Sequence, residues 1–187
     1  MNNITTIHSM AGYCHELALW KMLVDLCKTL LEDESQRTIL SPLRIRLDGN
    51  DFKLEKAEDQ DAQPEFIPPE GVGNLGETGI VWSLGALVCF ASSGHFIFGG
   101  RGGSYQRNNP TVGLPVLRKE HSALTPLVQR CLCFSPSQRI SLKDLYEEAC
   151  KGMERAKNRP RVEAHRLNVG TEYISITSEE IWPEKMY

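Results

Sequence analysis

The chain has 187 residues, which is enough for one domain with a hydrophobic core of ordinary size and a short appendage. Its hydrophobic fraction of 41% and charged fraction of 24% are typical of a globular protein. The formal net charge of -3 excludes a general electrostatic attraction to nucleic acid or to an anionic membrane, so we expect neither as a partner.

Six cysteines are present, and their placement favours a reducing environment. Most of them lie at apolar positions of helical patterns, and no two are spaced as Cys-x-x-Cys. Cys131 and Cys133 are two residues apart, which is a poor spacing for a metal site. We therefore expect buried, reduced thiols in a cytoplasmic protein that holds no metal and no cofactor. The polar first eleven residues show no secretory signal.

The first strong helical pattern begins at Glu16, after a polar lead-in over residues 1–14. Apolar side chains then recur at spacings of three and four residues as far as Leu31. The acidic run over residues 32–35 follows and ends the pattern. The sequence therefore predicts an amphipathic helix that starts at Glu16 and ends in charged residues.

An alternating stretch over residues 43–47 is followed by Asp48-Gly49 and by a second alternating stretch over residues 51–54. Two such stretches on either side of an Asp-Gly turn predict a small β-hairpin. Arg44 and Arg46 alternate on the first strand. A phosphorylated partner is one interpretation of these two cations, but we favour a solvated strand face.

The stretch from Ile80 to Ala91 is the most apolar part of the chain, and no charged residue occurs from Thr78 to Gly100. A helix that is apolar on every side must be surrounded by protein or by lipid. The apolar run is much shorter than the ~20 residues of a membrane span. We therefore expect residues 78–93 to form the buried central helix of a mainly α domain.

Loop-forming and helix-capping residues divide the remainder of the chain. Residues 94–115 are rich in Gly, Asn and Pro and are predicted to be mainly loop. Thr125 followed by Pro126 predicts the N-cap and first residue of a helix. Ser141 predicts the capped start of a last helix. From residue 158 the composition turns polar, so we treat residues 158–187 as an extension.

Three motifs, in this order and with these separations, resemble parts of the C-terminal lobe of protein kinases. Residues 67–70 (Ile-Pro-Pro-Glu) are similar to the end of the activation segment, with a proline in place of alanine. Residues 80–85 (Ile-Val-Trp-Ser-Leu-Gly) are similar to the start of the family's central helix. Residues 131–139 are similar to the segment that ends in a structural arginine. The resemblance covers roughly residues 10–157.

The same resemblance implies that the residues required for catalysis are missing. Counting from the hairpin, the replaced positions are Ile39 for the catalytic Asp, Ser41 for the phosphate-contacting Lys, Arg44 for the magnesium-binding Asn, Lys56 for the magnesium-binding Asp, and Ile80 for the Asp that ties the catalytic loop to the central helix. Phosphoryl transfer needs metal ions and an oriented nucleophile, so we expect no enzyme activity.

One polar pair of the family is retained. In kinases the Glu at the end of the activation segment and the structural Arg hold that segment to the lower lobe, and these residues match Glu70 and Arg139. The resemblance therefore implies a buried, bidentate ion pair between them.

Two further motifs have plain structural interpretations. Residues 71–76 fit Gly-x-Gly-x-x-Gly, but a Pro-Pro-Glu turn precedes them and the next Lys is Lys119, so we interpret them as the entry to the central helix. Arg101 lies among four glycines, and we expect it in a loop rather than in an RNA-binding segment. The five histidines show no metal-ligand spacing.

The predicted fold is therefore a mainly α, kinase-like C-lobe over residues 1–157, without an N-lobe, plus the extension. We expect a pseudokinase-type, non-catalytic module that binds a protein partner or a second copy through the surface that an N-lobe would cover. The extension, with Trp182 and the alternating residues 173–176, is a candidate cover for that surface. The alternatives are the C-lobe half of a split kinase that needs a separate N-lobe chain, and a degenerate remnant that only folds.

Overall fold

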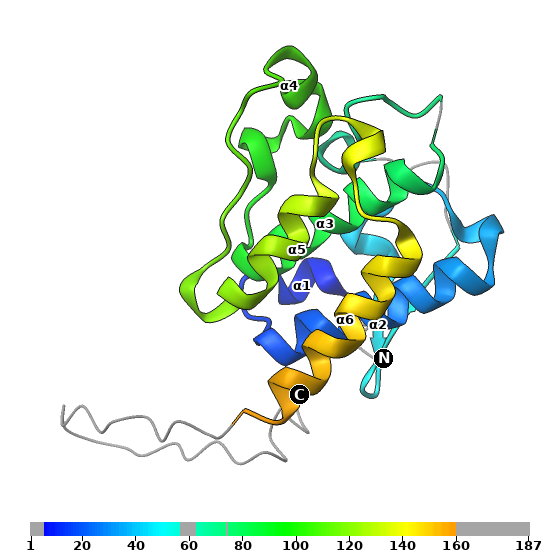
Figure 1. Ribbon diagram of the computed structural model, residues 1–187. Helices are drawn as coiled ribbons and strands as arrows, with labels where there is room; N and C mark the ends of the chain where they lie inside the picture. The colour runs from blue at the N-terminus through cyan, green and yellow to red at the C-terminus, as the bar shows by residue number, and fades with distance from the viewer. Residues whose placement is uncertain (1–5, 57–62, 74, 160–187) are drawn as a thin grey trace.

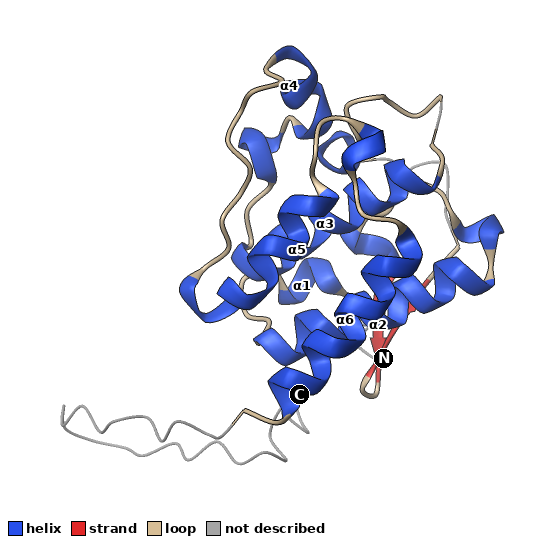
Figure 2. Cartoon of the chain, in the orientation of Figure 1, coloured by secondary structure: helices blue, strands red, loops and turns tan. Residues whose placement is uncertain are grey.

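The computed structural model describes residues 6–56, 63–73 and 75–159 (Figure 1). This part of the chain is mainly helical and has one two-stranded antiparallel sheet (Figure 2), which confirms the predicted fold class. The helices are α1 (Ile7–Met10), α2 (Glu16–Glu32), α3 (Glu77–Ser93), α4 (Gly102–Asn108), α5 (Thr125–Cys131) and α6 (Leu142–Lys157), and the strands are β1 (Ile45–Asp48) and β2 (Asp51–Leu54).

Helix α3 is the buried centre of the molecule, as the sequence predicted. Every residue from Gly79 to Ser92 is buried, because α1, α2, α5 and α6 pack around it (Figure 1). The helix ends at Gly94, whose φ of 74° places it in the left-handed region that glycine adopts without strain. The Gly94 N–H donates to the carbonyl of Phe90 and satisfies one of the last helical acceptors.

Helices α2 and α6 form the most extensive helix pair, and they lie side by side in Figure 1. At their contact the indole of Trp20 lies against Gly152, where a Cβ atom would be 2.5 Å from the ring. Glycine is therefore required at this position for packing rather than for backbone conformation. The indole N–H of Trp20 donates to Glu16 Oε1 at 3.0 Å, so its polar edge is also satisfied.

The hairpin forms as predicted, with Asp48 paired to Asp51 across the turn. It begins at Ile45, however, and residues Pro42–Arg44 form a short 3-10 helix (η2) instead of strand. The reason is local, since the Ser41 hydroxyl accepts the N–H of Leu43 and Pro42 favours a helical turn at this position. The prediction that Arg44 lies on a strand is therefore wrong.

The predicted loop over residues 94–115 contains helix α4, so that prediction is also wrong in part. The composition of α4 is poor for a helix, but its glycines allow close packing. A Cβ atom at Gly102 or Gly103 would overlap the backbone of residues 64–69, and the Gly103 N–H donates to Ile67 O at 2.9 Å. Tertiary contacts thus stabilise a helix that local propensity does not favour.

The caps of the last two helices follow the prediction to within one residue. Ser141 is the N-cap of α6, and its hydroxyl accepts the N–H of Asp144 at 3.0 Å. Helix α5 begins at Thr125 itself, with Leu124 as the N-cap. The Thr125 hydroxyl accepts the N–H of Leu117 instead of capping the helix, which explains the difference.

The expectation of buried thiols is only partly confirmed, and the predicted extension is largely outside the described residues. Cys133 and Cys150 are partly exposed, so the expectation that all six thiols are buried is wrong for these two. Residues 160–187, which make up nearly all of the predicted extension, lie outside the described residues. Within the ranges that the structure describes, no helix has both the length and the apolar character needed to cross a membrane.

The Trp20–Gly152 contact predicts that replacing a helical glycine by alanine lowers the free energy of unfolding, which is the opposite of the usual effect. A Gly→Ala substitution inside a helix normally stabilises a protein by about 0.5–1 kcal/mol. We expect Gly152→Ala instead to destabilise this one by about 1–3 kcal/mol, because the added methyl group overlaps the indole. Urea unfolding of the full chain measures the difference.

Gly73→Ala is the matched control, since a Cβ atom at Gly73 would meet nothing within 4 Å. Its free energy of unfolding should change little. A gain in stability for Gly152→Ala would contradict the close α2–α6 packing described above.

Candidate functional site

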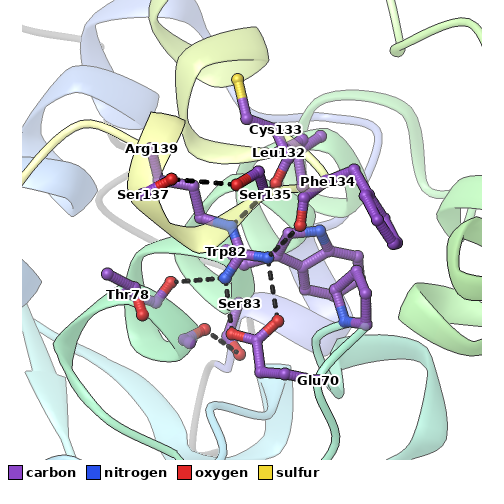
Figure 3. A network of polar contacts seen from close by, with 12 residues as sticks. Glu70, Thr78, Trp82, Ser83, Leu132, Cys133, Phe134, Ser135, Ser137 and Arg139 are labelled. Atoms are coloured by element: carbon purple, nitrogen blue, oxygen red, sulfur yellow. Dashed lines mark hydrogen bonds and ion pairs between the residues drawn. The ribbon is translucent and has the colours of Figure 1, made fainter. Parts of the chain in front are cut away.

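The Glu70–Arg139 pair is present and lies at the amino end of α3 (Figure 3). Arg139 Nη1 donates to Glu70 Oε1 at 2.6 Å, and Nη2 donates to Oε2 at 2.9 Å. These two parallel bonds form the bidentate fork in which an arginine holds a carboxylate best. The Arg139 side chain is fully buried and that of Glu70 is 19% exposed.

Arg139 also donates to three backbone carbonyls. The acceptors are Cys133 O at 2.8 Å, Thr78 O at 3.0 Å and Phe134 O at 3.0 Å. One guanidinium therefore joins the Pro-Pro-Glu segment, the first turn of α3 and the loop between α5 and α6. Its desolvation cost is offset because both the charge and the N–H donors have partners.

A second buried network fixes the surroundings of this pair. Trp82 Nε1 donates to Gln106 Oε1 at 2.9 Å, and Gln106 Nε2 donates to Leu132 O at 2.8 Å. The Ser83 hydroxyl donates to Phe66 O at 2.7 Å. The polar atoms of the buried α3 face thereby hold α4, the end of α5 and the segment before Glu70 in place.

Arg44, which the resemblance aligns with a magnesium-binding Asn, is buried, with 2% of its surface exposed. Its Nε and Nη2 donate to Glu55 O at 3.1 and 2.7 Å, and its Nη1 donates to Ile39 O at 2.8 Å and to Thr38 Oγ1 at 2.7 Å. The expectation of a solvated Arg44 is therefore wrong. The guanidinium instead clamps the segment before β1 to the residue after β2.

The other replaced positions also contribute structure rather than reactive groups. Ile80 and Ser41 are fully buried, and the Ser41 hydroxyl donates to Gln63 Oε1 at 3.1 Å. Ile39 is partly buried against the core, whereas Lys56 is exposed. Over the described residues, no three or more His, Cys, Asp and Glu side chains are grouped so that they could hold a metal ion.

The glycine motif precedes α3 and Arg101 lies in a turn, as the sequence predicted. Gly71 has a φ of 82° and donates its N–H to Pro68 O in the turn before α3. The fourth residue of the motif, residue 74, lies outside the described residues. Arg101 is exposed, and its guanidinium lies 4.2 Å from the centroid of the Tyr105 ring.

The sequence analysis missed a buried Ser–His pair at the carboxyl end of α3. Ser92 Oγ lies 2.6 Å from His121 Nδ1, and both residues are buried. Burial lowers the pKa of His121 below its ordinary value of 6.5, so the ring is neutral at neutral pH and Nδ1 accepts from the hydroxyl. No sequence signal marks this pair, because its members are 29 residues apart and meet only through the fold.

This pair resembles the nucleophile and base of a hydrolase only in composition. Ser92 has no exposed surface and His121 is 3% exposed, so no substrate can reach the hydroxyl. Arg118 Nη1 donates to Ser92 O at 3.0 Å and to Gly12 O at 2.8 Å beside it. The cluster therefore fastens the end of α3 to the amino-terminal segment.

Buried thiols offer no nucleophile either. Burial raises the pKa of Cys14 to about 11 and that of Cys89 to about 12. Both thiols are protonated at neutral pH, whereas a reactive cysteine needs its thiolate. The described site residues thus provide tight structural contacts and no activated acid, base or nucleophile.

No protein-family model matches this chain, and a search of curated proteins finds no match to it. The kinase resemblance therefore depends on the order of the motifs and on the residue positions described above.

The ion pair predicts a strong, shared contribution to stability. Glu70→Ala and Arg139→Ala should each lower the free energy of unfolding by about 3–5 kcal/mol, because each leaves a buried charge without its partner. The double variant should lose clearly less than the sum of the two, since the same contact is removed twice. Chemical denaturation of the four proteins measures this coupling.

Glu154→Ala, which removes the exposed partner of Lys157, is the matched control and should cost about 0–1 kcal/mol. Small and additive effects at Glu70 and Arg139 would show that their pair is not an anchor.

The lowered pKa of His121 predicts that the protein loses stability as the pH decreases. Because burial depresses its pKa in the folded state, the unfolded chain takes up a proton first as the pH drops below about 6.5. The free energy of unfolding should therefore decline below that pH and level off once the folded ring is also protonated. Glu120, Arg118 and Glu16 are the charged groups that influence this ring.

Unfolding measured from about pH 8 to about pH 5 tests this prediction. His121→Gln should flatten the decline because the amide accepts from Ser92 without titrating. His95→Gln, at an exposed histidine, is the control and should leave the slope unchanged. An equal slope in the wild type and in His121→Gln would contradict the assignment.

Proposed function

We propose that this protein is a non-catalytic, kinase-like C-lobe that acts as a protein-interaction or regulatory module. The order of its elements supports the kinase resemblance: a long helix, a hairpin, a Pro-Pro-Glu turn, a buried tryptophan helix and two closing helices. The Glu70–Arg139 pair supports it further, because this polar contact belongs to the structural part of that lobe.

The buried guanidinium of Arg44 is the observation that carries the non-catalytic part of the proposal. In the resemblance Arg44 occupies the position of a magnesium ligand, and here it donates to the carbonyls of Ile39 and Glu55. A cation at this position repels a metal ion. Moving it away would break its hydrogen bonds to these carbonyls, each worth about 1.5–3 kcal/mol because the donor is charged.

The same observation disfavours the split kinase. A split kinase would need a separate lobe and also a metal site where Arg44 now forms its contacts. A remnant that only folds would keep the Arg44 contacts for stability alone, so binding of a partner is what separates it from an interaction module.

The surface beside the hairpin is where the resemblance predicts a partner or a second copy. Part of it is covered by the chain itself, since Thr6 forms a β-bridge with Arg46 and α1 contacts both η2 and β1. Leu43, 44% exposed, is the large exposed apolar side chain closest in sequence to the hairpin among the described residues. The contribution of the extension to this surface is a prediction that falls outside the described residues.

The proposal predicts that the full chain does not bind Mg²⁺-ATP. Its thermal midpoint should stay the same with ATP, with Mg²⁺ and with both, because a ligand stabilises only the protein that binds it. Binding at about 100 times the Kd would add about 2.7 kcal/mol, which thermal unfolding resolves readily. Arg44→Asn, which restores the family's residue, should lower the midpoint without creating nucleotide binding.

Arg46→Asn is the matched control, because Arg46 lies two residues further on, on β1, with its side chain 38% exposed. It should lower the midpoint much less than Arg44→Asn does. A magnesium-dependent rise in the wild-type midpoint, or transfer of labelled phosphate from ATP to the protein, would contradict the proposal and favour the split kinase.

A further inference from the structure

Two hollows meet at the carboxyl end of α3. One has a volume of about 330 Å³ and the other about 500 Å³, and Ser93, His95 and Arg118 line both of them. Because they share these three residues, they form one continuous depression, which we name the α3 groove. It is lined by the end of α3, the loop that follows it, the turn at residues 11–13 and the segment between α4 and α5.

The α3 groove contains several apolar lining residues, and two of them are strongly exposed. Phe96, Phe98 and Val116 line the smaller hollow, and Tyr13 lines the larger one. Tyr13 and Val116, at 86% and 76%, are the two most exposed large apolar side chains in the described part of the chain. Exposed apolar groups that gather at one depression indicate a binding surface rather than a scatter of surface residues.

The backbone along one wall can accept a strand. Residues 112–118 run as an extended segment along one edge of the molecule (Figure 1). Leu117 donates its N–H to Thr125 Oγ1, and Pro115 O accepts from Gln129 Nε2, so these two residues turn their backbone groups toward α5. In an extended chain the residues at the alternate positions turn theirs to the opposite side.

Val116 lies between Pro115 and Leu117, and Leu114 directly precedes Pro115, so both occupy the alternate positions. Within the described residues their backbone N–H and C=O groups have no hydrogen-bond partner. This spacing of two residues is the one at which a strand edge pairs with an incoming extended peptide. The backbone of the segment is therefore arranged for β-strand addition.

The groove has one strongly basic residue, Arg118, among its described lining residues. The titratable residues that line it are Cys89, Tyr13, His95 and Arg118. No Asp or Glu is among the described residues that line either hollow. Arg118 Nε pairs with Glu120 Oε1 at 3.0 Å, but both side chains are about half exposed. An exposed pair of this kind is worth little, so a carboxylate from a partner can replace Glu120.

We propose that the α3 groove binds an extended peptide segment of a partner protein. The segment pairs its backbone with Leu114 and Val116, places an apolar side chain between Phe96, Phe98 and Val116, and presents a carboxylate to Arg118. This inference rests on the proposed function as an interaction module, and it names the surface and the chemistry of the partner.

The probe is a fluorescent eight-residue peptide in which isoleucine and aspartate alternate. Its anisotropy should rise on titration with the full chain, and a peptide with lysine in place of aspartate should bind at least about tenfold more weakly. Charge is varied on the peptide because Arg118 also holds Gly12 and Ser92 in the fold. Methylating alternate backbone nitrogens should abolish binding in one register and spare it in the other.

On the protein side, Val116→Asp places a charge in the apolar wall and should weaken binding about tenfold or more. Val72→Asp is the matched control, because Val72 is 56% exposed and lines neither hollow. It should bind like the wild type. Both positions are exposed, so neither variant threatens folding, and thermal unfolding verifies this.

The proposal is overturned if the acidic peptide does not bind, or if the lysine peptide binds equally well. It is also overturned if N-methylation weakens binding equally in both registers, or if Val116→Asp binds the acidic peptide with the affinity of the wild type. Self-association that Val116→Asp removes would assign the groove to a second copy instead. The nucleotide test is independent, so failure of the groove and failure of the non-catalytic module are read from different measurements.

Discussion

The guanidinium of Arg139 determines where three separate parts of the chain meet. It is fully buried, and a buried charge is stable only when a counter-charge and acceptors surround it. Glu70 supplies the charge, and the carbonyls of Thr78, Cys133 and Phe134 supply the acceptors. The Pro-Pro-Glu turn, the start of α3 and the loop after α5 must therefore adopt one relative arrangement, and the helices that continue from them inherit it.

Arg44 shows the same physical rule used for a different purpose. Its guanidinium is also buried, but its contacts run to the backbone of Ile39 and Glu55, on the two sides of the hairpin. Where Arg139 supports an arrangement that the kinase resemblance implies, Arg44 occupies the place that the resemblance assigns to a magnesium ligand. Both guanidiniums are thus structural, and each joins backbone segments that are distant in the sequence.

The sequence predicted those elements whose signals are local. The apolar circumference of α3, the helical period after Glu16 and the Asp-Gly hairpin turn each specify a structure within a few residues. Helix α4 was missed because its stability comes from the contacts of Gly102 and Gly103 with residues 64–69, which no local pattern reports. The burial of Arg44 was missed for a related reason, since an alternating pattern gives the face of a side chain only if the residue is in a strand.

Two long-range polar contacts, one predicted and one missed, show the same difference. Glu70 and Arg139 are 69 residues apart, and their contact could be inferred only because the motif order supplied a whole arrangement. Ser92 and His121 belong to no such motif, so their contact was invisible before the fold was known. Long-range polar contacts are therefore predictable from a single sequence only where a family-like pattern supplies the geometry.

Helix α3 is anchored at both ends, and this has a consequence for binding. Arg139 holds its amino end, while Arg118, the Ser92–His121 pair and the hydrogen bond from Gly12 N–H to Ala91 O hold its carboxyl end. The α3 groove is built on that second anchor, so its floor is fixed before any partner arrives. A preformed surface loses little conformational entropy on binding, and most of the ordering cost then falls on the incoming segment. A short segment has few residues to order, which limits that cost.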